Sequence, residues 1–109
     1  MTDAELARLR PTEGARLVLE LETADGEGGG ARYRGWVIVT TAAWPYRIEL
    51  RAGAEPALTA VGDAAPDDLE AALAMIARLT ARAAGKKGAD GLTPWPHRVQ
   101  RWRGPGRGM

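Results

Sequence analysis

The chain has 109 residues, with 15 Lys and Arg against 14 Asp and Glu, a single His and no Cys. This length and composition predict one soluble globular domain. The absence of Cys excludes a disulfide framework, a thiol nucleophile and every cysteine-ligated metal or iron–sulfur site. One His excludes an all-histidine metal site within one chain, and the absence of Ser excludes a serine triad.

No stretch of the sequence reaches the roughly 18–20 apolar residues that a membrane helix needs. Residues 1–10 are charged throughout and lack the apolar centre of a secretory signal. We therefore expect a cytoplasmic protein with no membrane partner.

The charge is unevenly distributed. Residues 1–77 carry 7 Arg and 13 acidic residues, a net charge of −6, whereas residues 78–109 carry 8 Arg and Lys and one Asp, a net charge of +7. An acidic body with a basic end indicates that the end either meets a polyanion or folds back on the body.

Two helices are predicted. Residues 3–9 form a short helix with Thr2 or Asp3 as its cap. The main helix begins after Pro66, where acidic residues have the spacing of a capping box, and it ends at Gly85. Residues that recur at helical spacing predict an apolar stripe along the main helix: Leu69, Leu73, Ile76, Leu79 and Ala83.

Alternating apolar and charged residues predict strands between the two helices. Residues 15–23 alternate with three leucines on one face, and residues 46–52 alternate most regularly. Residues 32–41 are apolar on both faces at their centre, which is typical of a central strand. A short fourth strand is predicted over residues 57–61, and residues 42–45 are predicted to form a turn.

These elements predict the α+β class: a three- to four-stranded antiparallel meander sheet packed by one main C-terminal helix, with a short N-terminal helix. Residues 1–91 make up this domain. Residues 92–109 form an extended tail rich in Pro, Trp and Arg, in which residues 98–103 are compatible with a strand. The last six residues, rich in Gly, are expected to be disordered.

The basic, aromatic tail is the main candidate site. Arg and Lys neutralise phosphates and indole rings stack on bases, so this mixture is typical of single-stranded nucleic-acid binding. Two alternatives stand beside it: the rings pack on the open face of the sheet, or the segment docks a partner protein. The candidate binding residues are Lys86, Lys87, Trp95, His97, Arg98, Arg101, Trp102, Arg103 and Arg107.

No catalytic, cofactor-binding or metal-binding constellation is predicted. The acidic residues read as solvated strand faces or helix caps: Glu20, Glu22, Glu49, Asp67, Asp68 and Glu70. The glycine-rich segment 26–30 lacks the phosphate-loop pattern and reads as a hairpin loop. His97 has no nucleophile or orienting partner in the sequence.

The order α–β–β–β–α resembles that of double-stranded-RNA-binding domains, and the four strands followed by a helix are similar to dimeric single-strand-binding coactivators. The first family places basic residues at the start of the last helix, where this chain has Asp67 and Asp68. These likenesses are in topology alone, so no site residue is transferred.

We therefore expect a small non-catalytic module that binds a partner protein or a second copy of itself, with no cofactor and no small-molecule substrate. The alternative is a protein that binds single-stranded nucleic acid through its basic aromatic segment.

Overall fold

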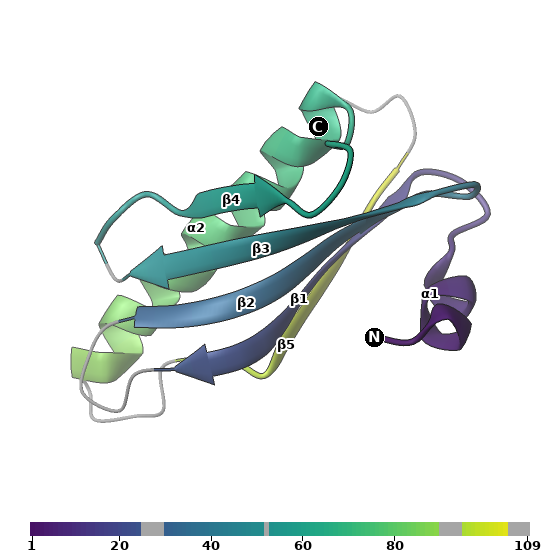
Figure 1. The fold of residues 1–109 in the computed structure, drawn as a ribbon. Helices are drawn as coiled ribbons and strands as arrows, with labels where there is room; N and C mark the ends of the chain where they lie inside the picture. The colour runs from purple at the N-terminus through teal and green to yellow at the C-terminus, as the bar shows by residue number, and fades with distance from the viewer. Residues whose placement is uncertain (25–29, 52, 90–94, 105–109) are drawn as a thin grey trace.

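The computed structural model describes residues 1–24, 30–51, 53–89 and 95–104. The strands form one antiparallel sheet in the order β4-β3-β2-β1-β5 (Figure 1). This arrangement confirms the α+β class, with five strands in the sheet. In chain order the elements are α1 (Asp3–Leu9), β1 (Ala15–Ala24), β2 (Gly30–Ile38), β3 (Ala43–Arg51), β4 (Ala57–Ala60), α2 (Asp67–Ala89) and β5 (Arg98–Arg103).

The fifth strand lies in the segment predicted as a tail. β5 pairs with β1, with Arg101 opposite Leu17. The meander accounts for β1 to β4, and α2 then carries the chain from β4 at one edge of the sheet to β5 at the other (Figure 1). Of the last six residues, predicted to be disordered, residues 105–109 lie outside the described residues.

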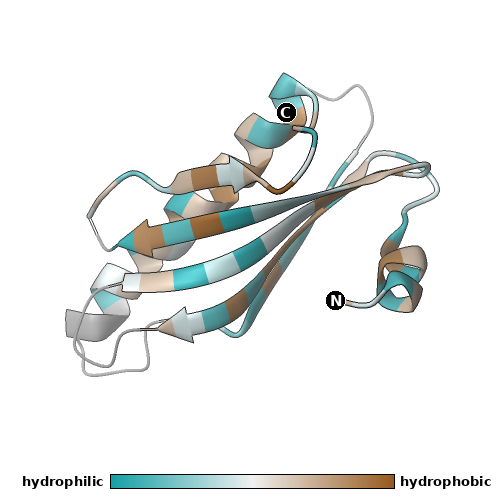
Figure 2. Cartoon of the chain, in the orientation of Figure 1, coloured by the Kyte–Doolittle hydropathy of each residue, from teal (hydrophilic) through white to brown (hydrophobic). Residues whose placement is uncertain are grey.

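The main core lies between α2 and one face of the sheet. Strand residues alternate between this face and the other, as the banding of the strands shows (Figure 2). A Cβ atom placed on Gly35 would lie 2.5 Å from Ile48 Cδ1 and 3.5 Å from Leu73 Cδ2. Glycine at this position therefore leaves room for the Ile48 side chain between the sheet and α2. Fully buried side chains of this core include Leu19, Tyr33, Tyr46, Ile48, Leu50 and Leu73.

The helix does not bury the whole stripe that its spacing predicts. Leu73 is fully buried, but Leu79 is 51% exposed and Ala83 is exposed. Small residues form the rest of the buried surface of α2: Ala77, Ala81 and Ala84. Because these alanines hold the sheet side of the helix close to the strands, Leu79 lies at the flank of the helix instead of beneath it.

A second, smaller core lies on the opposite face of the sheet. Val18, Trp36 and Ile38 pack there against Leu6 and Leu9 of α1. α1 has the predicted bounds, and its cap is Thr2, whose Oγ1 accepts a hydrogen bond from the Glu5 N–H (3.2 Å). This small helix therefore covers a buried apolar part of a face that elsewhere carries charged side chains and the exposed Trp102.

Three predicted boundaries are wrong. The strand predicted over residues 32–41 spans Gly30–Ile38. Residues 42–45 are not a turn: β3 begins at Ala43, and the chain reverses just before it, where the Val39 N–H donates to the Ala42 carbonyl (2.8 Å). Pro45 is tolerated in the strand because pairing with β4 begins only at Tyr46. Nor does Gly85 end α2, which continues to Ala89.

Two tyrosine hydroxyls tie distant segments to this core. Tyr33 donates to the Pro96 carbonyl (2.7 Å), and Tyr46 donates to Glu70 Oε2 (2.7 Å) while accepting from the Ala65 N–H (2.8 Å). Burial raises the pKa of Tyr33 to about 12. Burial also raises the pKa of Tyr46, and the hydrogen bond to Glu70 adds to that rise.

These tyrosines predict a loss of stability at alkaline pH. The unfolded chain releases a tyrosine proton near pH 10, whereas folded Tyr33 keeps its proton up to about pH 12. Stability is therefore fully present below about pH 10, and Tyr33 alone lowers the free energy of unfolding by about 1.4 kcal/mol per pH unit above it.

The measurement is urea denaturation of the wild type and Tyr33→Phe at about pH 9 and about pH 11. The variant is expected to be less stable at the lower pH and to lose less stability between the two. The same pH dependence in both proteins would contradict the assignment to Tyr33.

Candidate functional site

A groove of about 720 Å³ lies between α2 and β5, on the face of the sheet that the helix covers. α2 packs on β1, β2 and β3, and the groove opens where the sheet extends past the helix towards β5. Its lining residues come from β1, α2 and the end of β5: Leu17, Asp68, Ala71, Ala72, Met75, Ile76, Leu79, Arg101, Trp102, Arg103 and Gly104. A smaller hollow continues along β5 past Val99 to Pro96.

The groove carries exposed apolar surface. Met75 is 49% exposed and Leu79 51%. Trp102 is 54% exposed, but its side chain lies on the opposite face of the sheet. The fourth large hydrophobic residue exposed in the described parts of the chain is Val61, which lies elsewhere. Clustered apolar exposure is a recognised mark of an interaction surface, whereas scattered single residues are not.

β5 leaves one backbone edge open. In an antiparallel pair, residues alternate between those whose N–H and C=O groups face the partner strand and those whose groups face away. The hydrogen bond from the Leu21 N–H to the His97 carbonyl fixes the phase of this alternation. Arg98, Gln100 and Trp102 therefore direct their backbone groups to the outside of the sheet, where none of the described strands pairs with them.

The surroundings of the groove are mostly basic. The Arg101 guanidinium donates to the Gln100 carbonyl (2.8 Å), and the Arg103 guanidinium donates to the Asp68 carbonyl (3.1 Å). Within the described ranges, neither arginine forms an ion pair with a carboxylate. On α2, exposed Arg82 and Lys86 follow Met75 and Leu79 at helical spacing on the same side of the helix.

Most of the sequence-predicted binding residues come together around β5. Arg98, Arg101, Trp102 and Arg103 lie within the strand, and exposed His97 precedes it. Lys86 is exposed on α2. Lys87 belongs to α2, but its side chain lies outside the described residues, as does the whole of Arg107.

Trp95 is separated from this group because it belongs to the core. Its side chain is 4% exposed, and its ring meets the edge of the Tyr33 ring with centroids 6.3 Å apart and planes at 62°. A ring buried in this way is not accessible for stacking on a base. Trp95 therefore packs in the core, as the packing alternative predicted for the rings of this segment. It packs on the face that α2 covers and not on the open face of the sheet.

Trp102 lies on the other side of the strand from the groove floor. It is opposite Arg16 in β1, and its indole N–H donates to the Glu13 carbonyl (3.2 Å). The spacing of Trp95, Val99 and Trp102 gives no single face, and the structure shows why: Trp95 precedes the strand, while Val99 and Trp102 occupy opposite faces of it.

Sequence reasoning missed the helix side of the groove. Met75 falls outside the predicted stripe, and Leu79 was predicted to be buried. A signal was present in the small residues at Ala72, Ala77 and Ala81, which leave little bulk on the sheet side of the helix. The alanines alone do not show that a further strand, β5, extends the sheet past the part that α2 covers.

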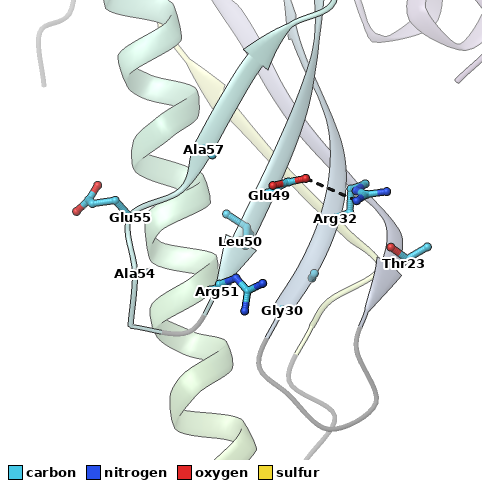
Figure 3. A pocket seen from close by; sticks show the side chains of 10 residues that line it. Thr23, Gly30, Arg32, Glu49, Leu50, Arg51, Ala54, Glu55 and Ala57 are labelled. Carbon is cyan, nitrogen blue, oxygen red and sulfur yellow. Dashed lines mark ion pairs between the residues drawn. The ribbon is translucent and has the colours of Figure 1, made fainter.

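A second hollow lies at the opposite edge, near the ends of β2, β3 and β4 (Figure 3). Arg32 and Glu49 face each other across it (3.6 Å), and Glu55 at its rim pairs with Arg78 of α2 (3.1 Å). Two of its acidic groups are thus engaged in ion pairs, and the hollow has no exposed large apolar side chain. It is the weaker candidate for a binding site.

Several of the acidic residues predicted to be solvated or to cap the helix are engaged in ion pairs or hydrogen bonds. Glu20 pairs with Arg98 (3.7 Å), Glu22 with Arg34 (2.7 Å), and Glu70 accepts from Tyr46. Over the described ranges, no group of three or more His, Asp or Glu side chains is placed to hold a metal ion. Nor is any described helix long and apolar enough to cross a membrane.

No protein-family model, curated sequence or solved structure matches this chain. The evidence on function is therefore the groove between α2 and β5, with its exposed apolar residues and its open strand edge.

Proposed function

We propose that the protein is a small non-catalytic interaction module that binds a partner protein in the groove between α2 and β5. The observation that carries this proposal is the half-exposed pair Met75 and Leu79 beside the open backbone edge of β5. Apolar side chains and unpaired strand groups next to each other are the two components that a protein partner complements. The absence of Cys supports a cytoplasmic location for this activity.

The test is selection of a random peptide library displayed on phage against the immobilised protein. Peptides are expected to be recovered whose binding to Leu79→Glu is at least about tenfold weaker, because a carboxylate would stand in the apolar wall. Val61→Glu, which changes an equally exposed apolar residue away from the groove, is the control and should bind them normally. Recovery of no peptides, or of peptides indifferent to Leu79→Glu, would contradict the proposal.

A second candidate function is binding of single-stranded nucleic acid. It is supported by half-exposed Trp102, which shares a face of the sheet with Arg98 and lies opposite Arg16 of β1. Such a site would bind oligothymidylate with an affinity that falls steeply with salt.

A further inference from the structure

The groove combines three properties that restrict its partner: an apolar helix flank, an open strand edge and an excess of positive charge. We infer that its ligand is an extended acidic segment of a partner protein, which adds to the sheet as a strand beside β5. This inference rests on the proposed function and specifies the chemistry of the partner.

The backbone edge favours a polypeptide as the ligand. Arg98, Gln100 and Trp102 direct N–H donors and C=O acceptors in alternation to the outer side of β5. The Gln100 carbonyl accepts from the Arg101 guanidinium (2.8 Å) and keeps a second lone pair for an added strand. Another extended polypeptide matches both kinds of group, as in strand addition to a sheet edge. A phosphodiester backbone offers acceptors only, so it would leave the strand carbonyls without donors.

The side chains of an added strand would alternate between two environments. On one face they would meet the flank of α2, where Met75 and Leu79 are half-exposed. The same face carries Arg101, whose guanidinium is bound only to a backbone carbonyl among the described contacts. Apolar side chains with carboxylates between them suit this surface.

Charge favours an acidic segment over a second copy of this chain. β5 contains three arginines, Arg98, Arg101 and Arg103, and no acidic residue. In an antiparallel pair of two β5 edges centred on Gln100, Arg98 would lie opposite Trp102 and Arg101 opposite Val99. Six arginines would then gather on two adjacent strands that contain no carboxylate, and this repulsion disfavours a second copy. An acidic strand would instead bring carboxylates to Arg101 and Arg103, which form no ion pair within the described ranges, whereas Arg98 is paired with Glu20.

The test uses three labelled peptides of about eight residues, a usual strand length. They alternate Val with Glu, Val with Thr, or Val with Lys. By fluorescence anisotropy the acidic peptide should bind with a dissociation constant on the order of 10 µM, the neutral one at least about tenfold more weakly, and the basic one not at all. An acidic peptide with prolines at alternate positions should also fail, because proline has no N–H to donate.

The matched variants are Arg101→Glu in the groove and Arg47→Glu on the opposite face of the sheet, where Arg47 is exposed. Arg101→Glu should weaken binding of the acidic peptide at least about tenfold and should favour the basic peptide. Arg47→Glu should leave the affinity within about twofold. Thermal unfolding of each variant confirms that it is folded.

Several results would overturn the inference. Equal binding of the neutral or basic peptide would mean that the groove takes a strand without regard to acidic charge. Failure of all three peptides would also overturn it, and the library selection would then show whether the groove binds proteins at all. Dimers lost in Leu79→Glu would assign the groove to a second copy, and oligothymidylate binding lost in Arg101→Glu would assign it to nucleic acid.

Discussion

Replacement of Trp95 by alanine will lower the free energy of unfolding by about 3–5 kcal/mol, the usual cost of truncating a buried large aromatic side chain. The ring is 4% exposed and packs against Tyr33 in the core that α2 covers. The backbone next to it accepts the Tyr33 hydroxyl at the Pro96 carbonyl. Loss of the indole therefore removes both buried apolar area and the packing that positions this turn before β5.

Trp102→Ala is the matched control because it deletes the same side chain from the same segment. Trp102 is 54% exposed, so its removal should cost no more than about 1 kcal/mol. Urea denaturation followed by circular dichroism measures both values. Equal losses in the two variants would show that Trp95 is not the structural tryptophan of this segment.

Leu73→Ala will lower the free energy of unfolding by about 2–5 kcal/mol, as expected for a leucine truncated in a core that collapses only partly. Leu73 is fully buried in the core between α2 and the sheet, and its Cδ2 lies 3.5 Å from the position of a Cβ on Gly35. The space that the Leu73 side chain fills lies between the strands of the sheet and the backbone of α2. The cavity left by the substitution would therefore persist.

Leu79→Ala makes the same chemical change in the same helix. Leu79 is 51% exposed, and its truncation should cost less than about 1 kcal/mol. Urea unfolding at neutral pH compares the two variants. A larger loss in Leu79→Ala would mean that the helix rests on the stripe predicted from its spacing and not on Leu73 and the alanines.

The sequence predicts the elements whose pattern is local. Alternation in residues 15–23 and 46–52 is enough to indicate β1 and β3, since one face of each strand is apolar and the other charged. The helix that begins at Asp67 is indicated by its spacing and acidic start, although the sequence places its end at Gly85 and not at Ala89. β5 has neither signal: its residues carry charge on both faces, and prolines precede it.

The sequence predicted the strand side of the groove but not its helix side. The basic and aromatic composition of residues 98–103 marks the strand side of the groove, because charge and aromatic content can be counted from the sequence. The helix side depends on how far the sheet extends beyond α2, which is set by the pairing of β5 with β1. Pairing between distant segments leaves no local pattern in the sequence. Met75 and Leu79 could therefore not be predicted to line the groove.

The pairing of Ala15 with Arg103 also has a consequence for how the chain folds on the ribosome. β1 is an inner strand only when β5 is present, and β5 is the last of the described strands to be synthesised. Until then β1 is an edge strand with unpaired backbone groups, which is the form in which nascent sheets associate wrongly. Closing so distant a pair is slow. Completion of this sheet therefore waits for the synthesis of β5, and until then the charged side chains along β1, such as Glu20 and Glu22, oppose wrong pairing at its open edge.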